Sequence, residues 1–180
     1  NEILKPIPLG IGNSFQDKYI NIENVVDNLK SFKFDIEPKI YLNFRENTNI
    51  QHRQNLKNIF KNYNWATISD SELSLSQYNY EIADHSFALA PWGNGIDTHR
   101  IWESLYSGTI PITKYHYTLN TLKELPVLFV NEYEDINLEL LKSTLEYFAD
   151  SKFNFDKLKI DYWINERNKN NDLLNNIQEN

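Results

Sequence analysis

Residues 86–108 read SFALAPWGNGIDTHRIWESLYSG. The stretch opens with a nearly continuous apolar strand over residues 86–90, which Pro91 ends. A glycine loop at 93–95 follows, and the next residues predict a helix over 98–107 that stops at Gly108, the usual residue after a helix end. A short strand that is apolar on both faces and leads into a helix is typical of a parallel sheet covered on both sides.

The same alternation continues on either side of this stretch. Further strands are expected at residues 39–44, 65–68, 109–113 and 127–130, and further helices at 22–31, 50–62, 74–83, 136–148 and 156–176. We therefore predict an α/β fold, a Rossmann-like three-layer domain with a mostly parallel sheet, over residues 36–150. A leading segment with the short helix occupies residues 1–35, and a C-terminal helix lies within 151–180.

The composition excludes several classes of protein. Hydrophobic residues make up 41% and charged residues 24% of the 180 residues, which excludes disordered, collagen and coiled-coil chains. The absence of Cys excludes disulfides, thiolate catalysis and Cys-based zinc sites. The four His residues have no HExxH or HxxxH spacing, so we expect no metal site. The net charge of −7 argues against a generic nucleic-acid-binding surface.

The chain carries no sign of a membrane segment. No apolar run approaches the roughly 18 residues that cross a bilayer, and no signal peptide opens the chain. We therefore expect no membrane span and a cytoplasmic location. The chain begins at Asn1 and contains no Met, so we expect either that its start was removed or that it is a piece of something longer.

Cations gather where the predicted strands end. Arg53 and Arg100 fall in the first turns of predicted helices, where a cation opposes the helix dipole at a cost of about 0.3–1 kcal/mol. The carboxyl ends of parallel strands share one edge of a sheet, so both arginines are expected at one pocket, which Arg45 and Lys114 could join. A bound diphosphate would make these positions favourable, so the pattern predicts an anionic ligand.

The glycine loop supports the same site, because glycine lets the backbone approach a ligand closely. Asp97 or Thr98 can cap the following helix. Each feature also has a plainer interpretation: a first-turn arginine is often a solvated surface residue, the glycines can be only a turn, and Glu103 can be an exposed helix residue. The remaining candidates are expected to pack or to have no catalytic role, namely Trp92, Trp102, His52, His85 and His116.

Residues 91–103, PWGNGIDTHRIWE, followed by GTIPI at 108–112, resemble the donor-site signature of exostosin-like glycosyltransferases. Their layout is more distantly similar to that of the α1,3-fucosyltransferases. The resemblance covers about residues 5–148, and the GNGIDTHR stretch is its most specific part. Supporting segments are residues 7–11, 43–45, 48–49, Arg53 and 125–130.

The resemblance implies the C-terminal half of a GT-B fold, which has two Rossmann-like halves with the active site between them. This half would bind a nucleotide-diphosphate sugar, whose sugar is transferred to a hydroxyl of a glycan or another acceptor. No metal and no cofactor beyond the nucleotide sugar are implied. The acceptor half is missing or supplied elsewhere, so the isolated chain is expected to be inactive.

The resemblance also implies roles for single residues. Arg53 and Arg100 would hold the diphosphate, and Glu103 would accept hydrogen bonds from ribose or sugar hydroxyls. No residue is a convincing catalytic base, and Asp97 is the one candidate. Fucosyltransferases have Glu-Lys where this chain has His99-Arg100, which leaves the donor open. The complete predicted donor-binding set is Asn43, Arg45, Arg53, Gly93, Asn94, Gly95, Asp97, Thr98, His99, Arg100 and Glu103.

Two other functions fit the sequence. One is a non-catalytic module that binds a nucleotide sugar without turnover. The other is an unrelated flavodoxin-like or regulatory α/β domain.

Overall fold

The computed structural model describes residues 7–11, 32–69 and 72–178. The predicted helix at 22–31 and most of the leading segment lie outside these residues. Five short strands form one sheet in the order β2-β1-β3-β4-β5, and every neighbouring pair is parallel. The strands are β1 Ile40–Leu42, β2 Ala66–Ile68, β3 Phe87–Leu89, β4 Ile110–Lys114 and β5 Leu128–Val130. All five lie within or next to the predicted strands.

Side chains of the central strands alternate between the two faces of the sheet. Ile40 and Leu42 of β1 enter the largest apolar cluster, whereas Tyr41 between them enters another cluster on the opposite face. Strand β2 lies at an edge of the sheet and is only partly covered. Burial on both faces explains why the central strands read as continuous apolar runs.

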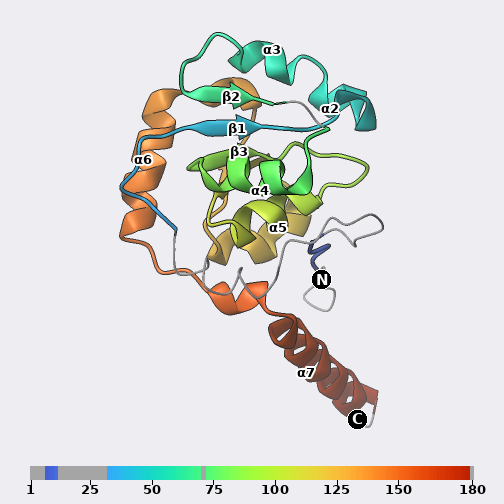
Figure 1. Cartoon of the computed structure of the whole chain (residues 1–180). Coiled ribbons are helices and arrows are strands. Elements are labelled where there is room, and N and C mark those ends of the chain that lie inside the picture. Colours follow the sequence, from blue (N-terminus) through green and yellow to red (C-terminus); the bar gives the residue numbers. More distant parts are fainter. Residues whose placement is uncertain (1–6, 12–31, 70–71, 179–180) are drawn as a thin grey trace.

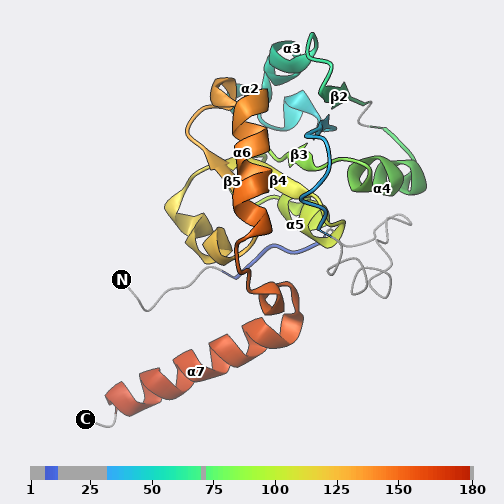
Figure 2. The same ribbon diagram turned by 90° about the vertical axis from the view of Figure 1, so that its left-hand side faces the viewer.

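Helices cover both faces, as expected for three layers. Residues of α3 (Leu56–Phe60) and α6 (Leu138–Ala149) pack in the largest cluster. The opposite face is covered by α4 (Leu75–Ala83), α5 (His99–Tyr106) and the 3-10 helix η2 (Tyr117–Glu124). Figures 1 and 2 show α6 on one side of the sheet and α4 with α5 on the other. The predicted α/β three-layer fold is confirmed.

The prediction of one helix over residues 50–62 is wrong. Two short helices, α2 (Ile50–Arg53) and α3, replace it, because Asn55 between them adopts the left-handed conformation with φ 66°. Asparagine tolerates this conformation better than other non-glycine residues. Arg53 therefore ends a four-residue helix and does not lie in the first turn of a long one, so the dipole argument does not apply to it.

Short 3-10 segments complete the described part of the chain. They are η1 (Glu46–Thr48), η3 (Tyr133–Asp135) and η4 (Phe155–Leu158). The last helix, α7 (Ile160–Gln178), begins four residues later than predicted and projects from the rest of the molecule (Figures 1 and 2). Elements β1 to α6 span residues 40–149, inside the predicted 36–150 domain.

The strand order creates a switch point between β1 and β3. From β1 the chain moves to β2 on one side, and it then returns to place β3 on the other side of β1. The loops after β1 and β3 therefore start side by side at the carboxyl ends of neighbouring strands and then lead in opposite directions. In doubly wound sheets such a point is where ligands bind.

Candidate functional site

A cavity of about 430 Å³ lies at this switch point. Its walls come from the loop after β1, the loop after β3 and the first turns of α5, with Leu9 of the leading segment at one side. All eleven residues of the predicted donor-binding set line it. The remaining lining residues are Leu9, Phe44, Thr48 and Pro91. Three arginines against two carboxylates give the lining a formal excess of one positive charge.

Lys114 does not join this cavity. It is the last residue of β4, and its ammonium group pairs with the Glu132 carboxylate and lies 5.4 Å from the centre of the Tyr133 ring. The suggestion that Lys114 adds to the pocket is therefore wrong. Strand β4 is not next to β1, where the cavity opens.

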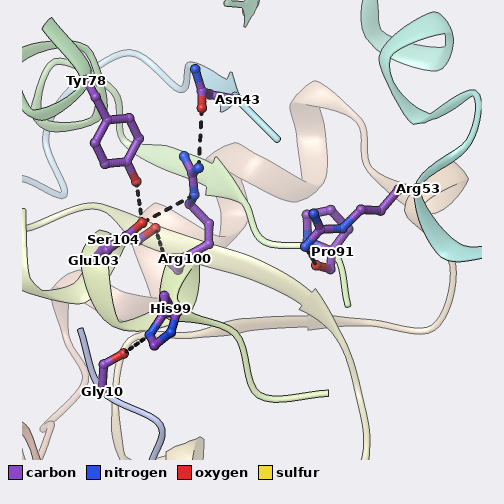
Figure 3. A network of polar contacts seen from close by, with 9 residues as sticks. All are labelled: Gly10, Asn43, Arg53, Tyr78, Pro91, His99, Arg100, Glu103 and Ser104. Atoms are coloured by element: carbon purple, nitrogen blue, oxygen red, sulfur yellow. Dashed lines mark hydrogen bonds and ion pairs between the residues drawn. The ribbon is translucent and has the colours of Figure 1, made fainter. Parts of the chain in front are cut away.

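Arg100 enters the cavity from the first turn of α5, as the sequence predicts. Its Nη2 donates to Oδ1 of Asn43 at 3.3 Å, and its guanidinium lies 4.6 Å from the centre of the Tyr78 ring (Figure 3). Its Nε is 3.6 Å from Oε2 of Glu103, too far for a hydrogen bond. Within the described part of the chain, Nε and Nη1 are buried and have no hydrogen-bond partner.

Glu103 lies one turn after Arg100 on α5. Its Oε2 accepts a hydrogen bond of 2.7 Å from the hydroxyl of Tyr78, which reaches it from α4. Burial raises the pKa of Tyr78 well above its ordinary value, so the phenol stays protonated and donates. Glu103 is thus not the freely exposed helix residue of the plainer interpretation.

Arg53 is buried, with 8% of the residue exposed, and its guanidinium bonds mainly to backbone. It donates to the carbonyl oxygens of Arg45, Pro91 and Trp92 at 3.1, 3.0 and 2.9 Å. Burial, and then the charge of Arg100, lower its pKa. Arg53 therefore ties the loop after β1 to the loop after β3.

The glycine loop packs closely against the guanidinium of Arg53. Gly93 is buried, and Asn49, the cap of α2, donates from Nδ2 to its carbonyl at 2.7 Å. Gly93 N–H donates to Gly95 at 3.0 Å, which closes the turn. Asn94 and Gly95 are exposed at its tip. The close approach that Gly93 permits is to Arg53, whereas the sequence-based expectation was an approach to a ligand.

Asp97 is occupied on both oxygens. Its Oδ1 accepts from Nε1 of Trp102 at 2.8 Å, and its Oδ2 accepts from the N–H of Leu9 at 2.7 Å. Burial raises its pKa above the ordinary 3.8, although these donors oppose the shift. Thr98 is the N-cap of α5, but no side-chain hydrogen bond caps this helix. Each Asp97 oxygen already accepts one hydrogen bond that holds the carboxylate in place, which argues against Asp97 as a base free to turn toward a substrate proton.

The leading segment touches the same loop at a second point. His99 Nδ1 donates to the carbonyl of Gly10 at 2.8 Å (Figure 3). Arg45, by contrast, is 60% exposed at the cavity rim and forms a long 3.7 Å ion pair with Glu72. The site therefore has a buried side around Arg53 and Arg100 and an exposed side around Arg45 and Asn94.

The other tryptophan and histidine residues have packing or hydrogen-bond contacts within the fold. Trp102 is 2% exposed in the core, and His85 contacts Thr67 and the carbonyl of Glu81. His52 packs against Trp92, and His116 caps η2. None of these three histidines lines the cavity.

The predicted donor-binding set leaves out two residues that hold parts of the site in place. Tyr78 lies on another helix, 25 residues from Glu103, and no local pattern marks it. Asn49 had a readable signal, because it precedes a helix and such residues often cap. In the described ranges, no group of three or more His, Asp or Glu side chains gathers as metal ligands would, and no helix combines the length and hydrophobicity of a membrane span.

No protein-family model matches the chain, and no curated protein matches it significantly.

Proposed function

We propose that this chain is the donor-binding half of an exostosin-like, GT-B glycosyltransferase, which holds a nucleotide-diphosphate sugar in the switch-point cavity. The proposal combines the resemblance of residues 91–112 with the position and charge of the cavity. A nucleotide sugar is the substrate, an acceptor hydroxyl on a glycan or similar molecule is the partner, and neither metal nor other cofactor takes part.

Arg100 is the observation that carries the proposal. Arg100 lines the cavity, and two N–H-bearing atoms of its guanidinium are buried behind that wall with no hydrogen-bond partner among the described residues. A buried donor left unpaired costs about 1–3 kcal/mol, and a phosphate oxygen would remove that cost. Arginine matches phosphate oxygens with paired donors, and the first turn of α5 adds its dipole.

The two arginines have different roles in this proposal. Arg100 contacts the diphosphate and stabilises the charge of the departing nucleotide. Arg53, whose donors already serve three carbonyls, holds the two loops in place. Because Asp97 is occupied, the catalytic base comes from the acceptor half, and this chain alone binds the donor without transferring its sugar.

Isothermal titration calorimetry with UDP and GDP tests the proposal. We expect binding that weakens about tenfold or more in Arg100→Ala, since a hydrogen bond to a charged group contributes about 1.5–3 kcal/mol. Arg167→Ala is the matched control, because it removes the same charge from α7, away from the cavity. Failure of every nucleoside diphosphate to bind at millimolar concentration would contradict the proposal.

The strand order favours a second candidate. The order 2-1-3-4-5 is that of flavodoxin-like sheets, which bind FMN at the same switch point. FMN in the same titration separates the two: tight FMN binding without UDP or GDP binding would favour the flavodoxin-like alternative. Donor binding without transfer, even after the acceptor half is supplied, would favour a non-catalytic module.

A further inference from the structure

The ion pair between Arg100 and Glu103 is a loose one. The two residues lie one turn apart on α5, and Nε is 3.6 Å from Oε2. Arginine and a carboxylate commonly form two parallel hydrogen bonds of about 2.7–2.9 Å, which this pair does not make. Instead, the carboxylate accepts its short bond from Tyr78 (Figure 3).

The two side chains nevertheless occupy one charged position in the cavity wall. Only 17% of the Arg100 side chain and 21% of the Glu103 side chain are exposed. In this partly dry position the carboxylate lies within ion-pair distance of Arg100, and an incoming phosphate would meet its repulsion. Nε and Nη1 of Arg100 are buried and have no hydrogen-bond partner among the described residues. They can donate to a ligand only when the guanidinium turns away from Glu103.

We propose that Glu103 is an internal anion that a phosphate group displaces from Arg100, while Tyr78 holds the released carboxylate in place for the ligand hydroxyls that the family resemblance assigns to it. The inference rests on the proposed function. It makes Glu103 a specificity-determining residue. Inorganic phosphate gives Arg100 a new partner but leaves the displaced Glu103 carboxylate without one. A phosphate ester that carries hydroxyls gives a new partner to both groups. The site therefore selects nucleotides over inorganic phosphates.

The orientation of Tyr78 supports this exchange. Its hydroxyl bonds to the carboxylate, and its ring face lies under the Arg100 guanidinium. One side chain thus contacts both members of the pair. Tyr78 can keep Glu103 in place when Arg100 turns toward a ligand, because its bond does not depend on the arginine.

Calorimetry with inorganic pyrophosphate and UDP as separate probes tests the exchange. We expect Glu103→Gln to bind pyrophosphate about tenfold more tightly than wild type, since a like charge at this range shifts an ionic equilibrium by that factor or more. The UDP affinity should rise much less, because the neutral amide oxygen of the variant accepts hydrogen bonds from ligand hydroxyls more weakly than the carboxylate does. Glu146→Gln, which removes one exposed charge from α6, should leave both affinities unchanged.

The outcomes separate this inference from the proposed function. If wild type binds UDP but Glu103→Gln binds pyrophosphate no more tightly, the exchange is wrong and the nucleotide site stands. Pyrophosphate binding by the variant, with no UDP binding by either protein, supports the displaced anion and overturns the nucleotide-sugar proposal. If neither protein binds either probe, both ideas fail.

A second measurement uses wild type alone, in case Glu103→Gln does not fold. The Nε–H resonance of Arg100 in ¹H–¹⁵N spectra, assigned with Arg100→Lys, should shift on saturation with UDP as Nε gains a phosphate acceptor. An Nε–H resonance that stays in place while backbone resonances of the glycine loop shift would overturn the exchange.

Discussion

The guanidinium of Arg53 lies where a side chain on Gly93 would begin. A Cβ atom on Gly93 would be 2.8 Å from Nη2 of Arg53, closer than real Cβ contacts come. The Nη2 atom cannot easily move away, because the guanidinium is bound to three carbonyls. The position of the Arg53 guanidinium at the cavity wall therefore requires a residue without a Cβ atom at position 93.

Gly93→Ala should lower the free energy of unfolding by about 1–3 kcal/mol, as overpacking of a tight site does. Gly95→Ala is the control, because a Cβ there would meet only the Asp97 carbonyl at an ordinary 3.6 Å. Urea denaturation of the two variants measures the difference. Equal losses of stability would show that the contact with Arg53 is not the cause.

Arg53→Lys should destabilise the protein by about 2–4 kcal/mol, since one ammonium group cannot reach three separately directed carbonyls. Arg45→Ala provides the comparison: its 60% exposed side chain makes only a long ion pair, worth less than about 1 kcal/mol. Chemical denaturation distinguishes them. A lysine variant as stable as wild type would mean that the charge alone is sufficient at position 53.

Asp97 gives the protein a specific pH dependence. Its pKa is raised by burial, so the folded state binds more protons than the unfolded state between pH 3.8 and the raised pKa. The contribution of Asp97 to the free energy of unfolding therefore falls as pH rises through this window.

Asp97→Asn removes that titration and one of the two acceptors. At neutral pH we expect the variant to be less stable by about 1–3 kcal/mol, because the amide NH₂ faces an N–H donor. The advantage of wild type should be largest near pH 3.8 and decrease above it, as followed by urea denaturation across pH. If the stability of wild type over Asp97→Asn instead increases with pH, then folding lowers the pKa of Asp97 and does not raise it.

Gly108 ends α5 with φ 73°, a left-handed conformation. Gly108→Ala should cost about 1–2 kcal/mol, because a Cβ is crowded there. Gly108→Asn should cost less, since asparagine tolerates this conformation. Thermal unfolding of both variants measures the order, and an alanine variant more stable than the asparagine variant would contradict this account.

The pattern of the sequence was enough to predict the sheet. Strand β3 and the start of α5 were readable from one stretch, because burial on both faces requires apolar residues throughout and Gly108 marks the helix end. The break at Asn55 was not readable, since Leu56, Ile59 and Phe60 have helical spacing on both interpretations. The position of Arg53 in its helix was wrong for this reason.

The sequence by itself determined that the loops after β1 and β3 meet at one edge of the sheet, because parallel strands bring their carboxyl ends together, although the same reasoning wrongly added Lys114. Only the tertiary structure decided the partners of the residues at the cavity. Arg53 bonds to carbonyls because two loops turn their oxygens toward it, and Tyr78 reaches Glu103 from a separate helix. Hydrogen bonds depend on directions and on differences of less than an ångström, and no spacing of residues along the chain encodes these.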